Sequence, residues 1–412
     1  MVVNIYDVVV IGGGAAGMMA AIQAGLRGRE VLLLEKNNRL GKKLLITGNG
    51  RCNITNSTPI EDMIGQVPGN GRFLYSAFYT FDNNAVLDFF HRQGVPTKEE
   101  RGGRIFPRSD RARDVVDGLA RALRQAGVEV MMGQSVEAVI PRAESSFTIR
   151  TSETEYTAGK VIIAVGGASC PRTGSSGDAY PWVREMGHKV TPILPALIPL
   201  VTQEKWVPQL QGLSLKNVCL TARQGKRKLG EEFGEMLFTH FGLSGPIVLT
   251  LSRAVAHALN KGARVTVELN LKPALTPDKL DQRLIKDFKT YARKQFKNAL
   301  DDLLPKMLIP VIIQLSAIDA EKPVHQITQE ERKSLVVLLQ CLTMTVSATR
   351  PLAEAIVTSG GVSVKEIDPS TMESRLVPGL YFAGEVMDID AYTGGYNLQA
   401  AWSTGYVAGN SI

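Results

Sequence analysis

Short apolar runs followed by glycines open the chain. Residues 6–11, YDVVVI, form a short apolar run, as expected of a strand that is buried on both faces of a parallel sheet. The glycine-rich stretch GGGAAG follows at 12–17, and a segment of helical composition leads to a second apolar run at 30–34. This order of strand, glycine turn, helix and strand predicts a βαβ unit.

The glycines of this turn have the spacing of a dinucleotide-binding motif. Gly12 permits a tight turn, Gly14 lets backbone N–H groups approach a pyrophosphate, and Gly17 allows the helix to pack closely on the strand. The pyrophosphate is expected at the helix N-terminus, where unpaired N–H groups and the helix dipole favour an anion. Glu35, 18 residues past Gly17, is placed to accept hydrogen bonds from ribose hydroxyls. The plainer alternative is a glycine-rich turn that binds nothing.

The following third of the chain predicts one helix and several short strands. Val115, Leu119 and Leu123 are spaced by four, which predicts a helix that Ser109 or Asp110 could cap. Strands are expected at 128–132, 136–140, 147–150, 156–158 and, ending in glycines, 161–167. A small β-meander in place of a crossover helix is typical of FAD-binding proteins of the glutathione-reductase type, so fold analogy favours FAD over NAD.

Two segments near the C-terminus support FAD. Residues 379–385, GLYFAGE, predict a strand that ends in a glycine and an acid. In such FAD folds this acid binds a ribityl hydroxyl, and Glu385, with Asp388 as the second choice, is expected to do so. Residues 394–401 predict a turn that opens a helix, whose terminal N–H groups would stabilise negative charge on a reduced flavin.

The glycine-punctuated pattern is lost between the two ends. Apolar runs near 196–270 are short and strand-like, whereas 278–341 has a helical pattern interrupted by prolines. The predicted fold class is therefore α/β, a glutathione-reductase-type FAD-binding Rossmann domain with an inserted mixed β-rich and helical domain. The expected FAD domain is 1–189 with 351–412, and the expected substrate domain is 190–350, β-rich over 190–275 and helical over 276–350.

Composition and cysteine usage narrow the class of protein. A chain of 412 residues that is 44% hydrophobic and 21% charged has the composition of a globular protein of two or three domains. Its four cysteines, Cys52, Cys170, Cys219 and Cys341, form no CxxC pair, which predicts neither a metal site nor a redox-active dithiol. Five scattered histidines add no metal-ligand spacing. We expect a cytoplasmic protein with no signal peptide, no membrane span and no metal.

The positive charge is concentrated in the middle of the chain. The net charge is +7, and residues 190–350 hold 22 Lys or Arg against 14 Asp or Glu, which leaves 25 against 26 elsewhere. The basic residues expected to contact a polyanion are Lys226, Arg227, Lys228, Lys286, Arg293 and Lys297. An RNA partner would explain them through phosphate contacts and counterion release. The plainer alternative is the solvated face of a basic protein.

Six stretches resemble one known family, the BaiN/RdsA-like NAD(P)/FAD-dependent oxidoreductases, which includes aminoacetone oxidases and ribosomal RNA dihydrouridine synthases. They are VVVIGGGAAG, LGKKLLITGNGRCNITN, the strand ending AVGG, LFTHFGLSGP, TSGGVSVKEID and GLYFAGEVMDIDAYTGGYNLQAA. The GRCN and GGYN pieces are specific, whereas very many proteins share the first glycine motif. The motifs and the resemblance together assign FAD to Gly12, Gly14, Ala15, Ala16, Gly17, Glu35, Lys36, Lys43, Thr47, Asn49, Gly50, Arg51, Cys52, Asn53, Val136, Ala164, Gly166, Gly384, Glu385, Asp388, Gly394, Gly395, Asn397 and Leu398.

The segment TGNGRCN at 47–53 lies along the isoalloxazine if the resemblance holds. Thr47, Asn49 and Asn53 would supply hydrogen bonds, although the family often has glycine at the position of Asn49, which would alter the approach of the loop to the ring. Arg51 could stabilise anionic reduced flavin or orient a substrate. Cys52 is a candidate proton donor, but the interpretation that we favour is a small buried contact residue.

The resemblance also implies a reaction. Members of the family reduce conjugated C=C bonds, and one branch makes dihydrouridine in large-subunit ribosomal RNA, a substrate that suits the basic insert. Hydride would pass from NAD(P)H through the flavin to uracil C6, with a proton added at C5 of an accessible or flipped base. Cys52, Tyr392 and Tyr396 are the candidate proton donors. Because no second GxGxxG turn is present, NAD(P)H is expected as a transient reductant that leaves before the substrate enters.

Two other functions stay open. One is a small-molecule flavoenzyme, either an enone reductase or an amine oxidase such as aminoacetone oxidase, which needs no basic surface. His240, in FTHFGLSGP, is a weak candidate for its substrate site. The other is a non-catalytic flavin-containing module that binds RNA or senses redox state.

Overall fold

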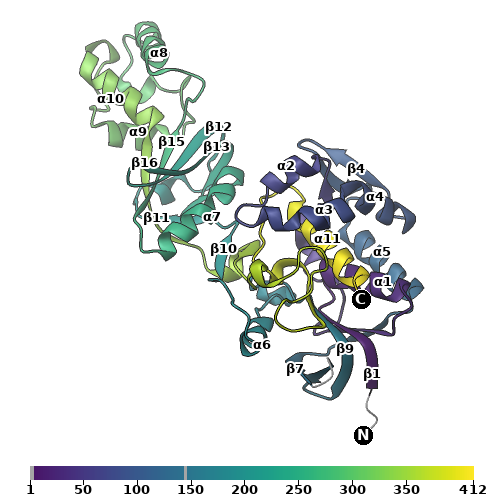
Figure 1. The fold of residues 1–412 in the computed structure, drawn as a ribbon. Coiled ribbons are helices and arrows are strands. Elements are labelled where there is room, and N and C mark those ends of the chain that lie inside the picture. Colours follow the sequence, from purple (N-terminus) through teal and green to yellow (C-terminus); the bar gives the residue numbers. More distant parts are fainter. Residues whose placement is uncertain (1–3, 143–145) are drawn as a thin grey trace. The chain divides into compact units, whose positions relative to one another are not determined.

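The chain forms two compact units in the computed structural model, which describes residues 4–142 and 146–412 (Figure 1). The first unit comprises Met1–Pro195 and Leu352–Ile412, and the second comprises Ala196–Pro351. The first unit is thus built from both ends of the chain, and the second unit is an insertion between them. Its role as a substrate domain remains a prediction.

A seven-stranded sheet forms the centre of the first unit, in the order β6-β2-β1-β9-β8-β7, with β18 beside β9. The strands are β1 (Asn4–Ile11), β2 (Val31–Glu35), β6 (Glu129–Met132), β7 (Val136–Pro141), β8 (Phe147–Thr151), β9 (Glu155–Ile163) and β18 (Leu380–Phe382). The strands β6, β2, β1, β9 and β18 are paired in parallel, whereas β7, β8 and β9 are antiparallel. This is the predicted α/β class of a Rossmann-type FAD-binding domain.

Two details of the predicted strands are wrong. The strand expected at 128–132 pairs with β2 at the far edge of the sheet, so it is not part of the meander. The strands expected at 156–158 and 161–167 form the single strand β9. Gly159 predicts a break between two strands. Strand β1 nevertheless pairs with β9 on both sides of this glycine, at Tyr6↔Ala158 and Val8↔Lys160. Pairing with a long neighbour therefore overrides the local signal.

Helices α1 (Ala15–Leu26) and α11 (Tyr396–Asn410) bring the two ends of the chain together. A Cβ atom on Gly405 would lie 2.3 Å from the carbonyl oxygen of Ala16, and one on Gly409 would lie 2.1 Å from that of Ala20. The two backbones therefore approach more closely than any side chain at these positions would allow. This crossing places the start of α11 in the same compact unit as the glycine turn.

The helix predicted from Val115, Leu119 and Leu123 is confirmed as α5 (Ala112–Gln125), but its predicted cap is wrong. Arg111 is the N-cap residue, and no side chain caps the helix. The Asp110 carboxylate accepts instead from Lys98 at 2.5 Å. This hydrogen bond is the main reason that the pKa of Asp110 is lowered, with the charges of Lys98 and Arg51 acting in the same direction.

The other elements of the first unit surround this sheet. The helices are α2 (Ile60–Gly65), α3 (Tyr75–Thr80), α4 (Asn83–Arg92) and α6 (Ala179–Glu185). The strands are β3 (Thr55–Asn56), β4 (Thr97–Glu100), β5 (Arg104–Pro107) and β17 (Val357–Ser359). Along the chain, the first unit changes to the second within β10 (Leu194–Ala196). Strands β3, β5 and β4 form a separate three-stranded sheet.

The second unit is a closed barrel with four helices, in the order β11-β14-β13-β12-β15-β16. The strands are β11 (Leu200–Thr202), β12 (Ser214–Gln224), β13 (Arg227–Phe238), β14 (Gly242–Ser244), β15 (Val265–Asn270) and β16 (Leu342–Thr349). The helices are α7 (Pro246–Asn260), α8 (Pro277–Thr290), α9 (Ile309–Ser316) and α10 (Gln329–Gln340), of which α8, α9 and α10 gather at one end of the barrel (Figure 1). Helix α7 lies in the stretch that we expected to be β-rich, and β16 in the stretch that we expected to be helical.

A buried histidine clamps the C-terminal part of the first unit. Nδ1 of His188 lies 3.1 Å from Glu366 Oε2, and Nε2 lies 2.9 Å from Ser374 Oγ. Ser374 Oγ also accepts from the backbone N–H groups of Leu376 and Val377, so its own proton points to His188. The order Ser, His, Glu resembles a hydrolase triad, but Ser374 is 6% exposed and its oxygen is used in a turn. His188 thus links the segments that carry Glu366 and Ser374. Its imidazole must be neutral, because Nδ1 donates to the carboxylate while Nε2 accepts from the hydroxyl.

This clamp predicts a loss of stability in mild acid. Burial lowers the pKa of His188, although the hydrogen bond to Glu366 acts in the opposite direction. The unfolded chain therefore binds a proton near pH 6.5 that the folded chain does not, and stability falls as the pH drops below about 6.5. Urea unfolding at pH 7.5 and 5.5 should show a larger fall in midpoint for the wild type than for His188→Gln. Equal falls in the two proteins would contradict this role of the histidine.

Candidate functional site

The glycine turn after β1 has the geometry that the motif predicts. Gly12 has φ of +107°, and a Cβ there would lie 2.6 Å from the carbonyl oxygen of Ala164. A Cβ on Gly17 would lie 1.8 Å from the carbonyl oxygen of Gly12, so helix α1 packs directly on the turn. Around Gly14 there is open space, and no side chain caps α1. The N–H groups of its first turn, including those of Ala15 and Ala16, can therefore receive an anion.

Glu35 lies at the end of β2, beside this turn. Its Oε2 accepts from Gly13 N at 2.7 Å, and its Oε1 accepts from Asn37 N at 2.8 Å. The residue is 7% exposed, so these hydrogen bonds hold its carboxylate in one place. Oε1 also accepts from Asn37 Nδ2 at 2.6 Å, so Oε2 is the oxygen with a further lone pair for a ribose hydroxyl. Lys36, in contrast, forms an ion pair with Asp178, which compensates its charge.

A second acid is held at the end of β18. Glu385 Oε2 lies 2.7 Å from Lys43 Nζ, which also donates to Ser169 Oγ at 2.9 Å. Glu385 Oε1 accepts from Thr358 N at 2.7 Å and from Ser169 Oγ at 3.1 Å. Because Oε2 has only one of these partners, it can still accept from a hydroxyl of a ligand. The structure thus brings the predicted residues Lys43 and Glu385 together.

Sequence reasoning missed the supporting residues of this acid. Thr358 Oγ1 accepts from the N–H groups of Ala168 and Ser169, which fixes the glycine-ended loop after β9. The small residues of GGAS at 166–169 could have indicated such a close packing site. In that loop Gly166 has φ of +77°, and a Cβ there would lie 2.8 Å from Ser175 Oγ.

A buried tyrosine near Glu385 was also missed. The hydroxyl of Tyr180, on α6, is buried without a hydrogen-bond partner among the described residues. Burial raises its pKa, and the charges of Glu385 and Asp388 act in the same direction. Its ring lies in a predominantly apolar setting, and no sequence motif marked it.

The other predicted positions around the turn are placed as follows. Gly384 has φ of +75°, and a Cβ there would lie 2.9 Å from the Cβ of Ala16, so the end of β18 approaches the start of α1. Val136 begins β7 and is 8% exposed. The loop before it is hydrogen bonded to β2 through Gln134 N and Glu35 O at 3.0 Å. Asp388 accepts from Asn70 Nδ2 at 2.7 Å through its backbone oxygen.

The segment TGNGRCN has an unusual backbone. Gly48, Asn49, Gly50 and Cys52 have φ values of 56°, 58°, 82° and 63°, in the left-handed region that side-chain-bearing residues rarely adopt. Such strain is commonly concentrated at functional sites. At the end of the segment, Asn53 Oδ1 is buried and has no hydrogen-bond partner among the described residues. An acceptor of this kind fits a ligand that donates a hydrogen bond.

Cys52 is buried with no exposed surface. Burial raises the pKa of its thiol to about 12, although a hydrogen bond with Thr47 acts in the opposite direction. A thiol in this setting is neutral and does not reach a substrate. The geometry therefore favours a small buried contact residue over a proton donor.

Substitution of this cysteine tests its role. Cys52→Ala should keep the turnover rate within about twofold of wild type and lower stability by about 1 kcal/mol, because it removes packing but no chemistry. Turnover per bound flavin and the midpoint of urea unfolding are the measurements. A fall in turnover of about a hundredfold or more at unchanged flavin content would instead identify a general acid.

Arg51 has its charge compensated. Its Nη1 lies 2.8 Å from Glu100 Oε1 and 3.4 Å from Asp110 Oδ1. Its guanidinium carbon lies 4.0 Å from the centre of the Phe106 ring. These contacts hold Arg51 in position, and they reduce the net positive charge that it can offer to a flavin or a substrate.

The start of α11 is a second open helix terminus. Gly394 and Gly395 have φ of +133° and +103°, and a Cβ on Gly395 would lie 2.4 Å from the carbonyl oxygen of Thr55. No side chain caps the helix, so its first N–H groups, up to that of Leu398, are available to a ligand. The Asn397 side chain is not available, because it bonds to both the N–H and the C=O of Ala391 at 2.8 Å.

The two candidate tyrosines differ in their settings. The Tyr396 hydroxyl lies 3.1 Å from Thr58 Oγ1, and the residue is 8% exposed. Tyr392 is half-buried, and its backbone N–H donates to Gln66 O at 2.9 Å. Asn397 fixes the loop that carries Tyr392.

The basic residues of the second unit are only partly free. Lys228 lies 2.9 Å from Glu231, and Lys297 forms an ion pair with Glu321. Lys226 is exposed in the turn between β12 and β13, and Arg227 is exposed at the start of β13. Lys279, Lys286, Lys289 and Arg293 are exposed and have no ion pair within the described residues. His240 is exposed between β13 and β14, with its ring edge-on to Phe241.

Within residues 4–142 and 146–412, no three His, Cys, Asp or Glu side chains are arranged to hold a metal ion. In the same part of the chain, no helix is both long enough and apolar enough to cross a membrane.

Comparisons with known proteins cover nearly the whole chain. Residues 6–411 match the family described as HI0933-like protein Rossmann domain. The chain is 35% identical over 409 residues to the 3-dehydro-bile acid delta(4,6)-reductase of Clostridium scindens, with 98% of each protein aligned. It is 32% identical to the ribosomal RNA dihydrouridine synthase of Escherichia coli, aligned over 99% of this chain and 98% of that protein. The synthase of that name from Haemophilus influenzae is 31% identical, with 98% of each aligned.

A solved structure has the same fold. The 3-ketosteroid delta1-dehydrogenase from Sterolibacterium denitrificans, in complex with 1,4-androstadiene-3,17-dione, superposes with a TM-score of 0.54 over 99% of both chains. The sequences are 15% identical, so this likeness concerns the fold alone.

Proposed function

The chain belongs to the HI0933-like family and is an oxidoreductase with an FAD-binding Rossmann domain; from that premise we propose that it uses NAD(P)H to reduce uridine to dihydrouridine in large-subunit ribosomal RNA. The names of the relatives support the reaction type. A delta(4,6)-reductase and a dihydrouridine synthase both saturate carbon–carbon double bonds. In uracil this bond is conjugated to a carbonyl group, which makes it an acceptor of hydride. A substrate of this kind also suits a cytoplasmic protein.

Several groups of the first unit would hold FAD. The open N-terminus of α1 and Glu35 suit a pyrophosphate and a ribose, and Glu385 with Lys43 suits a ribityl hydroxyl. Segment 47–53 and the open N-terminus of α11 suit the ring, as does the Asn53 oxygen, which has no partner in the described part of the chain. When bound, FAD supplies hydride transfer between the reductant and the substrate. These assignments rest on the fit of donors and acceptors to the groups of FAD.

The chain itself would stabilise charge and supply a proton. The first N–H groups of α11 favour a negative charge beside them, as does the positive end of the helix dipole. Tyr392 and Tyr396 remain the candidates for the proton at C5, because Cys52 is fully buried. The substitution Tyr392→Phe is expected to slow protonation of the substrate and to leave hydride transfer unchanged.

The exposed basic face of α8 is the observation that carries the RNA substrate. Lys279, Lys286 and Lys289 lie opposite the buried residues Leu280, Leu284 and Phe288 of the same helix. Arg293 lies three residues beyond the end of the helix. Cations that are not engaged by carboxylates are available to phosphates, and each contact would release a counterion.

A small conjugated enone is the second candidate substrate. The relative with 35% identity, named as a bile acid reductase, supports it. A small substrate gives no role to the basic face of α8. The two candidates therefore predict different effects of removing that charge.

Mapping of ribosomal RNA by mass spectrometry tests the proposal. RNA from cells that lack the gene should lose a uridine that carries two extra hydrogens. The intact gene should restore it, and a gene with a damaged glycine turn should not. Unchanged RNA would overturn the ribosomal substrate, and small enones and amines would then be assayed with the same purified flavoprotein.

A further inference from the structure

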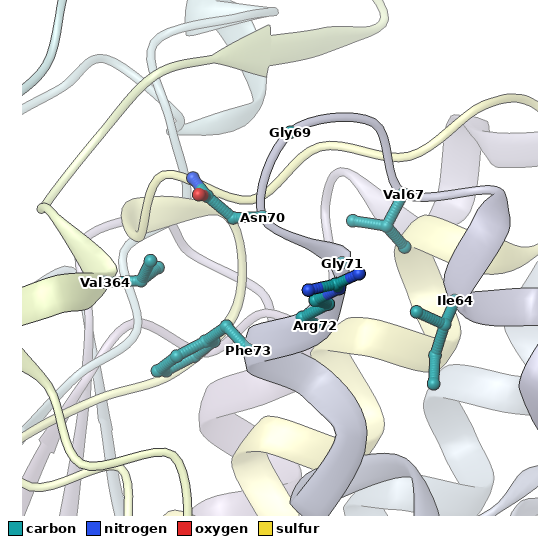
Figure 2. Close-up of a pocket in the computed structure, with 8 residues that line it drawn as sticks. All are labelled: Ile64, Val67, Gly69, Asn70, Gly71, Arg72, Phe73 and Val364. Carbon is teal, nitrogen blue, oxygen red and sulfur yellow. The ribbon is translucent and has the colours of Figure 1, made fainter.

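A pocket of about 410 Å³ lies in the first unit, at the loop that joins α2 to α3. Its lining residues are Ile64, Val67, Gly69, Asn70, Gly71, Arg72, Phe73 and Val364. Figure 2 shows Asn70 and Phe73 on the side that faces Val364, whereas Arg72 lies between them and the pair Ile64 and Val67. The volume is within the range of sites for small molecules, about 300 to 1,000 Å³.

Two polar groups of this pocket, the Arg72 guanidinium and the Asn70 side-chain oxygen, can bind a ligand. Arg72 is exposed and has no ion pair or side-chain hydrogen bond within the described residues, and it is the one charged residue of the lining that the structure describes. The Asn70 amide nitrogen donates to Asp388 O at 2.7 Å, which leaves its oxygen as an acceptor. Glu366, two residues from Val364, accepts from His188 and Lys189 N and forms no ion pair with Arg72 in the described part of the chain.

The pocket is joined to the segment that we propose contacts the flavin. Asn70 bonds to Asp388, and Gln66 O accepts from Tyr392 N at 2.9 Å. Asp388 and Tyr392 lie between Glu385 and the open start of α11. A molecule in this pocket would therefore rest against the loop between the two proposed flavin contacts.

We propose that this pocket binds the nicotinamide nucleotide half of NAD(P)H. Arg72 would pair with a phosphate, Phe73 would contact a planar ring, and the Asn70 oxygen would accept from the carboxamide. This inference rests on the proposed use of NAD(P)H and adds the place where the reductant docks. It also explains how a chain without a second glycine-rich dinucleotide turn in its sequence can hold that reductant.

A uridine nucleotide shares this chemistry, since it too carries a carbonyl-bearing ring on a ribose phosphate. The single cation favours the free dinucleotide. An RNA backbone is normally followed by several cations, because each phosphate contributes a separate contact. The lining supplies one guanidinium and otherwise apolar or amide groups.

Anaerobic stopped-flow reduction of the purified holoenzyme tests the proposal. NADH and NADPH are each mixed with wild type, Arg72→Ala, Arg72→Lys and the control Arg92→Ala, and loss of flavin absorbance is followed. Arg92 is an exposed arginine of the same unit without an ion pair within the described residues. Arg72→Ala should raise the apparent Kd of the reductant about 10- to 100-fold at an unchanged limiting rate. Arg72→Lys should recover part of the affinity, and Arg92→Ala should match wild type.

A second arm separates the two nucleotide sources. Enzyme reduced by dithionite is mixed with a ribosomal RNA fragment or, separately, with a quinone as an artificial oxidant. If Arg72→Ala slows reoxidation by RNA and leaves the Kd of NAD(P)H unchanged, the proposal is overturned and the pocket belongs to the RNA. No change in either arm, or no reduction of wild type by either nicotinamide, also overturns it. A wild type that NAD(P)H reduces but RNA does not reoxidise refutes the RNA substrate alone.

Discussion

Gly12→Ala is expected to yield protein without FAD and with activity lowered by at least about a hundredfold. A Cβ at this position would lie 2.6 Å from Ala164 O and 3.0 Å from Val165 Cα, and the backbone has φ of +107°. These neighbours are backbone atoms of the loop directly after β9, so they cannot move aside as a flexible side chain would. The turn must open, which displaces the N–H groups of α1 from the pyrophosphate.

The ratio of flavin to protein after purification measures this effect. Gly28→Ala is the matched control, because Gly28 has φ of +77° but nothing within 4 Å of its added Cβ. The Gly28→Ala variant therefore has the strain of a positive φ, about 1 to 2 kcal/mol, without any steric clash, and it should keep its flavin. Retention of wild-type flavin by Gly12→Ala would contradict the assigned site. Loss of flavin from both variants would show that backbone strain, and not the crowding at Ala164, is responsible.

Charge reversal on α8 is expected to abolish activity on RNA while leaving the flavin in place. The variant combines Lys279→Glu, Lys286→Glu and Arg293→Glu, three exposed cations without carboxylate partners in the described chain. Loss of three phosphate contacts should lower RNA affinity by about a hundredfold or more near physiological salt. It should also reduce the salt dependence of binding by about 0.7 to 0.9 per contact in a double-logarithmic plot.

Binding of an RNA fragment across a salt series, with flavin content and quinone reduction as internal references, tests this expectation. Single substitutions provide a matched pair. Lys286→Gln removes a free cation, whereas Lys297→Gln removes one that Glu321 already pairs, so the former should weaken binding more. If the triple variant is as active on RNA as the wild type, the basic face is a solvated surface. That result would support a small enone as the substrate.

The sequence by itself determined the class of the fold and the character of its nucleotide-binding turn. The apolar runs of β1 and β2 and the glycines at 12, 14 and 17 could be interpreted locally, because a positive φ or the absence of a Cβ is a property of one residue and its close neighbours. The strand before Glu385 and the helix that follows Gly395 were predicted for the same reason. The assignment of individual flavin contacts remains a prediction.

Only the tertiary structure decided which predicted groups are free to act. Lys43 meets Glu385 although the two are far apart in the chain, and Asn397 is used by Ala391. Lys228 and Lys297 have carboxylate partners that charge counting cannot identify. The burial of Cys52 also depends on what packs around it, as does the lack of a partner for the Asn53 oxygen among residues 4–142 and 146–412.

The architecture of the insert was decided in the same way. Strand β16 closes the barrel by pairing with β11 and β15, from which it is separated along the chain by 139 and 71 residues respectively. Its own sequence follows a helical stretch and contains no signal for that pairing. Local preferences are properties of neighbouring residues, whereas pairing, burial and charge compensation arise between segments that the chain brings together only on folding.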